Sequence, residues 1–143
     1  MTAIPTTPLS LGASDAVADA LAHHLWQGTP PSAGWSHDRL VLATAALVRR
    51  HGPAVALEAL TTTGPDTHVT RMVYLVWAVD RLVGAGVPTG RLLWHPLLDR
   101  RSLLCWWDAA TLNSDEARRT WVPPTLCDAD EPAPEPTSWC IAA

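Results

Sequence analysis

The chain has 143 residues, 48% of them hydrophobic, and a formal net charge of −4. This length favours a single domain whose core is large enough to fold without metal or disulfide crosslinks. All ten basic residues are arginines, and the ten acidic residues of positions 1–122 balance them, so the basic surface that nucleic-acid binding needs is not expected. The absence of lysine and the abundance of Ala, Val and Pro indicate a GC-rich coding bias and a bacterial origin.

Composition divides the chain into three parts. Residues 1–13 are expected to form a flexible leader, residues 14–122 a helical domain, and residues 123–143 a disordered, acidic, Pro-rich tail that ends in the apolar sequence WCIAA. The leader lacks the positive and apolar regions of a signal peptide, and no apolar run reaches the ~18 residues of a membrane span. We therefore expect a cytoplasmic protein that does not bind membranes.

The helical domain is predicted to be all-α, a compact bundle of five or six helices. The first helix is expected to have about one dozen residues after Ser14 as its N-cap and to end before Gly28, and aspartates in its first turns suit the helix dipole. The second is expected over 37–51, with Ser36 as N-cap and basic residues in the last turn. A short third helix over 53–60 opens on a proline, which is favoured at a first helical position.

The most apolar run of the chain, 69–83, is predicted to form the buried spine of the bundle, in a helix over about 67–83. Its apolar residues recur at spacings of three, four and seven, and a second apolar face lies beside the first. A helix with two apolar faces is normally covered on more than one side. Asp66 is the expected cap and Gly84 the expected end. The valine content also suits a strand, but the length and the cap favour a helix.

A second apolar region follows Pro88. Pro96 is expected to break any helix that runs through Trp94, and helical periodicity resumes from Leu97 to about Ala110. A last short helix is expected from Ser114 to about residue 121.

The chain shows no established motif for catalysis, cofactors or metals. Its histidines form no H-E-x-x-H pair, its three cysteines form no C-x-x-C pair, and neither a G-x-S-x-G turn nor a phosphate-binding glycine loop is present. We assign no catalytic, cofactor-binding or metal-binding residue. The sequence favours a non-catalytic role without excluding an enzyme.

Tryptophan is the strongest functional signal, with 8 residues against no phenylalanine. Trp94, Trp106 and Trp107 lie within one short segment. Trp139 and Cys140 belong to the apolar end of the tail, after its acidic, Pro-rich part. Tryptophan could fill the core in place of phenylalanine, but it is also enriched at binding hot spots. We therefore predict that these five residues contact a partner, which is another protein or a second copy of the chain.

Two alternatives remain at this point. A pocket between helices near Asp80, His95 and Cys105 would make the chain a small-molecule binder or an enzyme, because buried acids and thiols in a cavity have perturbed reactivity. The chain could also be a folded carrier of a C-terminal peptide that is docked onto a partner or modified, like the precursors of ribosomally made peptides.

Overall fold

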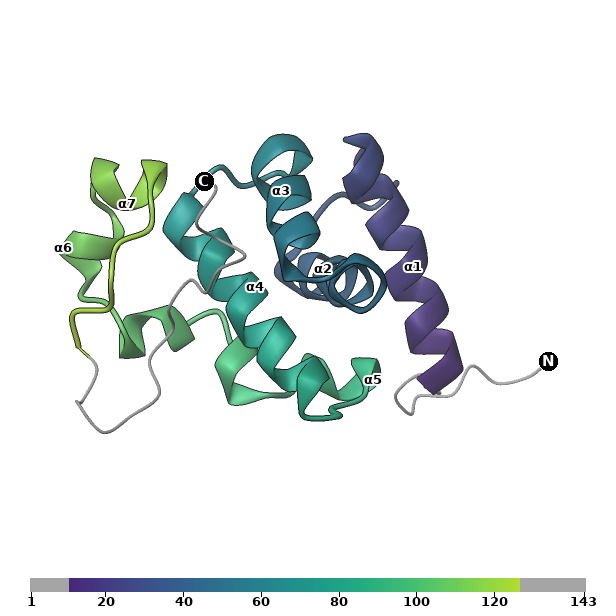
Figure 1. Cartoon of the computed structure of the whole chain (residues 1–143). Helices are drawn as coiled ribbons and strands as arrows, with labels where there is room; N and C mark the ends of the chain where they lie inside the picture. Colours follow the sequence, from purple (N-terminus) through teal and green to yellow (C-terminus); the bar gives the residue numbers. More distant parts are fainter. Residues whose placement is uncertain (1–10, 127–143) are drawn as a thin grey trace.

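The fold is all-α, as predicted. The structure is a computed structural model that describes residues 11–126, where it has seven α-helices, two 3-10 turns and no β-strand (Figure 1). Most of the predicted leader and tail lies outside these residues. Four helices exceed ten residues and three have only four or five. The elements are α1 Leu11–Gln27, α2 His37–His51, α3 Pro53–Thr63, α4 Val69–Gly84, α5 Thr89–Leu92, η1 Pro96–Leu98, η2 Ser102–Cys105, α6 Ala109–Leu112 and α7 Asp115–Arg119.

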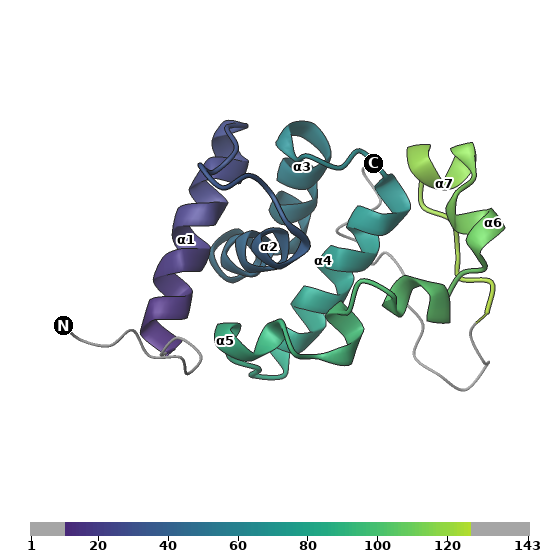
Figure 2. The same ribbon diagram turned by 180° about the vertical axis from the view of Figure 1, so that it is seen from behind.

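Helix α2 lies in the middle of the molecule and contacts α1, α3, α4 and α5. In Figures 1 and 2 it is seen nearly end-on, with α1 on one side and α4 on the other. Eight of its residues are buried, and three of these are alanines whose small side chains let the neighbouring helices approach closely. The predicted N-cap is confirmed, because the Ser36 hydroxyl accepts from the Arg39 amide at 3.2 Å.

The predicted spine is confirmed as helix α4. Nine of its 16 residues are buried, and it packs against α2, α3, α7 and η1. Its N-cap is His68 rather than the expected Asp66: His68 Nδ1 accepts from the Arg71 amide at 3.1 Å, and Asp66 accepts from the His68 amide at 2.9 Å. Because Nδ1 is an acceptor, Nε2 carries the proton that it donates to the Leu112 carbonyl at 2.7 Å. The cap therefore also fixes α6 against α4.

The helical periodicity predicted from Leu97 to Ala110 is not realised as one helix. The structure has two 3-10 turns there, and α6 starts only at Ala109. Polar side chains take the backbone groups that a helix would use. Asp99 Oδ1 accepts from the Arg101 amide at 2.8 Å, and the Ser102 hydroxyl donates to the Asp99 carbonyl at 2.6 Å.

A run of aromatic rings joins α4 to the C-terminal part of the described chain. The rings follow in the order Trp121, Trp107, Tyr74, Trp77 and Trp106, with neighbouring centroids 5.5–6.3 Å apart. Three of these four contacts are edge-to-face, the arrangement that the ring quadrupoles favour. The indoles therefore serve as core material here.

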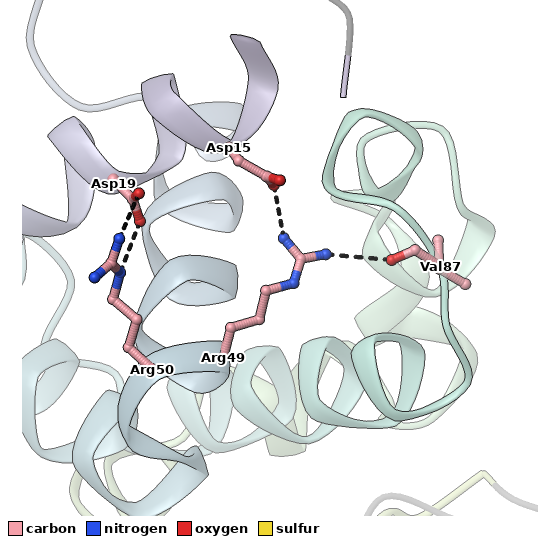
Figure 3. A network of polar contacts seen from close by, with 5 residues as sticks. All are labelled: Asp15, Asp19, Arg49, Arg50 and Val87. Atoms are coloured by element: carbon pink, nitrogen blue, oxygen red, sulfur yellow. Dashed lines mark hydrogen bonds and ion pairs between the residues drawn. The ribbon is translucent and has the colours of Figure 1, made fainter. Parts of the chain in front are cut away.

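Two arginines of α2 fix α1 in place (Figure 3). Arg50 binds both carboxylate oxygens of Asp19, at 3.0 and 2.7 Å, and this hydrogen bonding lowers the pKa of the Asp19 carboxyl. Arg49 donates to Asp15 at 3.0 Å and to the Val87 carbonyl at 3.4 Å, so it also reaches the turn after α4. These ion pairs are exposed, and salt therefore weakens them.

Candidate binding groove

A cavity of about 670 Å³ lies between the start of α2, one side of α4, the two 3-10 turns and α6. We call it the η1–η2 groove. Its volume is in the range of ligand pockets, about 300–1,000 Å³. More than half of the residues that line it are apolar: Trp35, Leu40, Pro65, Met72, Leu75, Leu97, Leu98, Leu103, Leu104, Ala109 and Leu112.

Side chains from two helices hold the η1 wall of the groove in place. The Tyr74 hydroxyl of α4 donates to the Leu97 carbonyl at 2.8 Å, and the Ser102 hydroxyl donates to the same oxygen at 3.0 Å. His37 of α2 donates from Nε2 to the Leu98 carbonyl at 2.6 Å. A 3-10 turn has few hydrogen bonds of its own. The position of η1 relative to α2 and α4 therefore depends on these side-chain contacts.

Most polar side chains that line the groove already have partners in the protein, whereas the buried Arg71 Nε has no hydrogen-bond partner within residues 11–126. His37, Tyr74 and Ser102 bind main-chain carbonyls, and Asp66 forms an ion pair with Arg71 at 3.3 Å. A site for a polar metabolite needs a few convergent polar groups that orient the ligand. The occupied groups therefore favour an apolar ligand that is recognised mainly by shape and burial.

The single tyrosine, Tyr74, makes the stability of the protein depend on pH in the alkaline range. Burial raises the pKa of the Tyr74 hydroxyl above its ordinary value, so its stabilising contribution is complete below the unfolded-state pKa and is lost as pH rises through the folded-state pKa. The chain has no lysine, so Tyr74 is the main group that titrates between about pH 10 and 12.

We expect Tyr74→Phe to lower the free energy of unfolding by about 1 kcal/mol at neutral pH, because the bond to η1 is lost. Above about pH 10 the wild-type chain should lose stability faster than the variant. Urea unfolding of both chains across this pH range tests the expectation. Parallel losses of stability would show that the Tyr74 hydroxyl does not hold η1.

The predicted partner-contact tryptophans have different environments. Trp94, which precedes η1, is 78% exposed, whereas Trp107 is completely buried and belongs to the core. Trp106 is half-buried against Trp77. Trp139 lies outside the described residues, as does Cys140. Trp94 is therefore the indole of the described part that offers most surface to a partner, and the partner-contact assignment stays a prediction.

The three residues of the predicted interhelical pocket do not line the η1–η2 groove. Asp80 is half-buried on α4, and His95 accepts from the Leu97 amide at 3.1 Å as the cap of η1. Cys105 is exposed at the end of η2. The enzyme or small-molecule hypothesis remains a prediction that this groove does not support.

Asp80 makes the spine sensitive to pH. Burial raises the pKa of its carboxyl, so its contribution to stability is complete below the unfolded-state pKa and decreases as pH rises through the folded-state pKa. We expect Asp80→Asn to raise the urea midpoint at about pH 7 and to give no gain at about pH 3. Asp115→Asn, on the exposed end of α7, is the matched control and should give no gain at either pH. An equal gain from both variants would contradict a role for burial.

Sequence reasoning did not find the groove, because its residues come from distant segments. His37 and Leu98 are 61 positions apart, and their contact depends on how α2 crosses η1. One signal was available in the sequence. Residues 97–104, directly after Pro96, contain four leucines, two on each side of the charged turn Asp99–Arg101. Such an apolar composition is unusual for a segment of short turns.

Comparison of the chain with protein-family models, with curated proteins and with solved structures found no match in any of the three. Within residues 11–126, no helix is both long and apolar enough to cross a bilayer. The same residues contain no cluster of three or more His, Cys, Asp or Glu side chains that could hold a metal ion.

Proposed function

We propose that the chain is a non-catalytic protein–protein interaction module that binds a short apolar segment in the η1–η2 groove. The observation that carries the proposal is a groove of about 670 Å³ that is lined mostly by apolar residues and in which His37, Tyr74 and Ser102 already bind main-chain carbonyls. The apolar side chains of such a segment gain free energy from burial there, about 25 cal/mol for each Å² removed from water.

Exposed apolar side chains at the groove support a protein partner. Leu104, in the groove, is 52% exposed, and Trp94, just before the η1 wall, is 78% exposed. Large apolar groups of this kind cluster at binding sites, and tryptophan is prominent among binding hot spots. We expect the partner segment to place two or three large side chains in the groove and to extend over Trp94.

A selection from a phage-displayed random peptide library on the full chain tests this proposal. We expect enriched peptides that share two or three large apolar residues at a fixed spacing. Leu104→Glu should weaken their binding by about tenfold or more, because an apolar segment that covers a charged carboxylate removes its hydration at a large free-energy cost.

Leu126→Glu is the matched control. Leu126 and Leu104 are both 52% exposed, but only Leu104 lines the groove. We expect the Leu126 variant to bind the selected peptides as tightly as the wild type. Equal losses in the two variants, or a selection that enriches no apolar peptide, would overturn the proposal.

A further inference from the structure

The described part of the chain ends against the segment that joins η2 to α6, next in sequence to residues of the η1–η2 groove. The Thr125 amide donates to the Trp106 carbonyl at 2.9 Å, and the Thr125 hydroxyl donates to Asp108 at 2.8 Å. Trp106 follows the groove residue Leu104 by two positions, and Asp108 directly precedes the groove residue Ala109. The rest of the chain is therefore tethered close to the groove.

The sequence after this tether has the composition of an apolar ligand on an acidic linker. Residues 127–138 contain four acidic residues and no arginine, and Trp139 and Ile141 follow them. Twelve residues span up to about 40 Å when extended. A domain of this size has a radius of gyration of only about 13 Å, so the tether reaches every part of the groove.

Charge complementarity favours the same placement. Arg71 and Arg100 both line the groove, and the exposed Arg101 follows directly. Asp66 pairs with Arg71, and Asp99 accepts from the Arg101 amide, so Arg100 and Arg101 are the guanidinium groups of this edge that lie outside the Asp66–Arg71 pair. Within residues 11–126, no ion pair occupies Arg100. An acidic linker that enters beside η2 meets the guanidinium groups of Arg100 and Arg101.

We propose that Trp139 and Ile141 occupy the η1–η2 groove of their own chain, so that an external partner binds by displacing them. This inference rests on the proposed function of the groove. The short linker gives the tail a local concentration in the millimolar range, so even a weak intramolecular contact competes with a free ligand. The groove is thus a regulated site whose affinity for partners depends on the tail.

The double variant Trp139→Ala/Ile141→Ala of the full chain tests the inference. We expect it to bind the peptides selected above about tenfold more tightly than the wild type, because the competing tail is removed. Its methyl NMR signals should differ from wild type mainly at Leu97, Leu103 and Leu104. Thr137→Ala, in the linker, is the control and should change neither. Equal peptide affinity in wild type and double variant would overturn the inference.

A dilution series separates the chain's own tail from that of a second copy. The wild-type methyl shifts should not depend on protein concentration, and a shift that disappears on dilution would overturn the intramolecular contact.

The two proposals fail in different ways. If peptide binding depends on Leu104 but not on Trp139 and Ile141, only the tail inference fails. If no peptide depends on Leu104, the proposed function itself fails.

Discussion

Trp107→Ala is expected to lower the free energy of unfolding by about 3–5 kcal/mol. Trp107 is completely buried, and its ring packs edge-to-face against both Tyr74 and Trp121. Its Nε1 donates to the carbonyls of Val122 and Pro123, at 2.9 and 3.1 Å. The substitution leaves a large cavity and releases the segment of Val122 and Pro123 that Trp107 holds. Because domains are stable by only about 5–15 kcal/mol, this is a large share of the total.

Urea unfolding monitored by far-ultraviolet circular dichroism measures this loss. Trp94→Ala is the control, because Trp94 is 78% exposed and its truncation should change stability by less than about 0.5 kcal/mol. Similar effects of the two substitutions would contradict the assignment of Trp107 to the core.

Gly64→Ala is expected to destabilise the fold by about 1–3 kcal/mol. Gly64 ends α3 in an extended conformation that any residue can adopt, so its backbone angles are not the reason. A Cβ atom at this position would instead overlap the carbonyl oxygen of Leu60, which belongs to the last turn of α3. That turn must move, and with it Pro65 and Asp66 at the edge of the groove.

Gly84→Ala provides a control of opposite sign. Gly84 is the last residue of α4, and a Cβ there has open space around it. Alanine in a helix is favoured over glycine, so this variant should be more stable by about 0.5–1 kcal/mol. If thermal unfolding shows equal effects of the two substitutions, crowding at Gly64 is not important.

Local patterns were enough to predict where the long helices lie, but α1 begins at Leu11, so the predicted cap Ser14 is wrong and residues 11–13 belong to the helix rather than to the leader. The apolar spacing of α4, the Ser36 cap of α2 and the proline at the start of α3 are all encoded within a few residues. The Ser114 cap of α7 is confirmed in the same way, because Ser114 accepts from the Ala117 amide at 3.2 Å. Capping and periodicity act over one or two turns, which is why sequence alone identifies them.

The segment that builds the groove was not predictable in this way. Its leucines and tryptophans have helical spacing, but Asp99, Ser102 and Asp108 bind backbone groups and divide it into short turns. The wall then depends on His37 and Tyr74, whose contacts with η1 exist only after α2 and α4 have packed. Periodicity cannot reveal such tertiary contacts, and it also could not separate the buried Trp107 from the exposed Trp94.

The most direct test of the groove as a binding site is a methyl NMR titration with indole, the side chain of the expected anchor residue. The double variant Trp139→Ala/Ile141→Ala is the appropriate protein, because its tail no longer supplies a competing indole. Saturable shifts centred on Leu97, Leu103 and Leu104, and their loss in a chain that also carries Leu104→Glu, are the predicted result. Shifts that do not saturate, or that centre on the opposite side of the molecule around α1, would contradict a binding site in the η1–η2 groove.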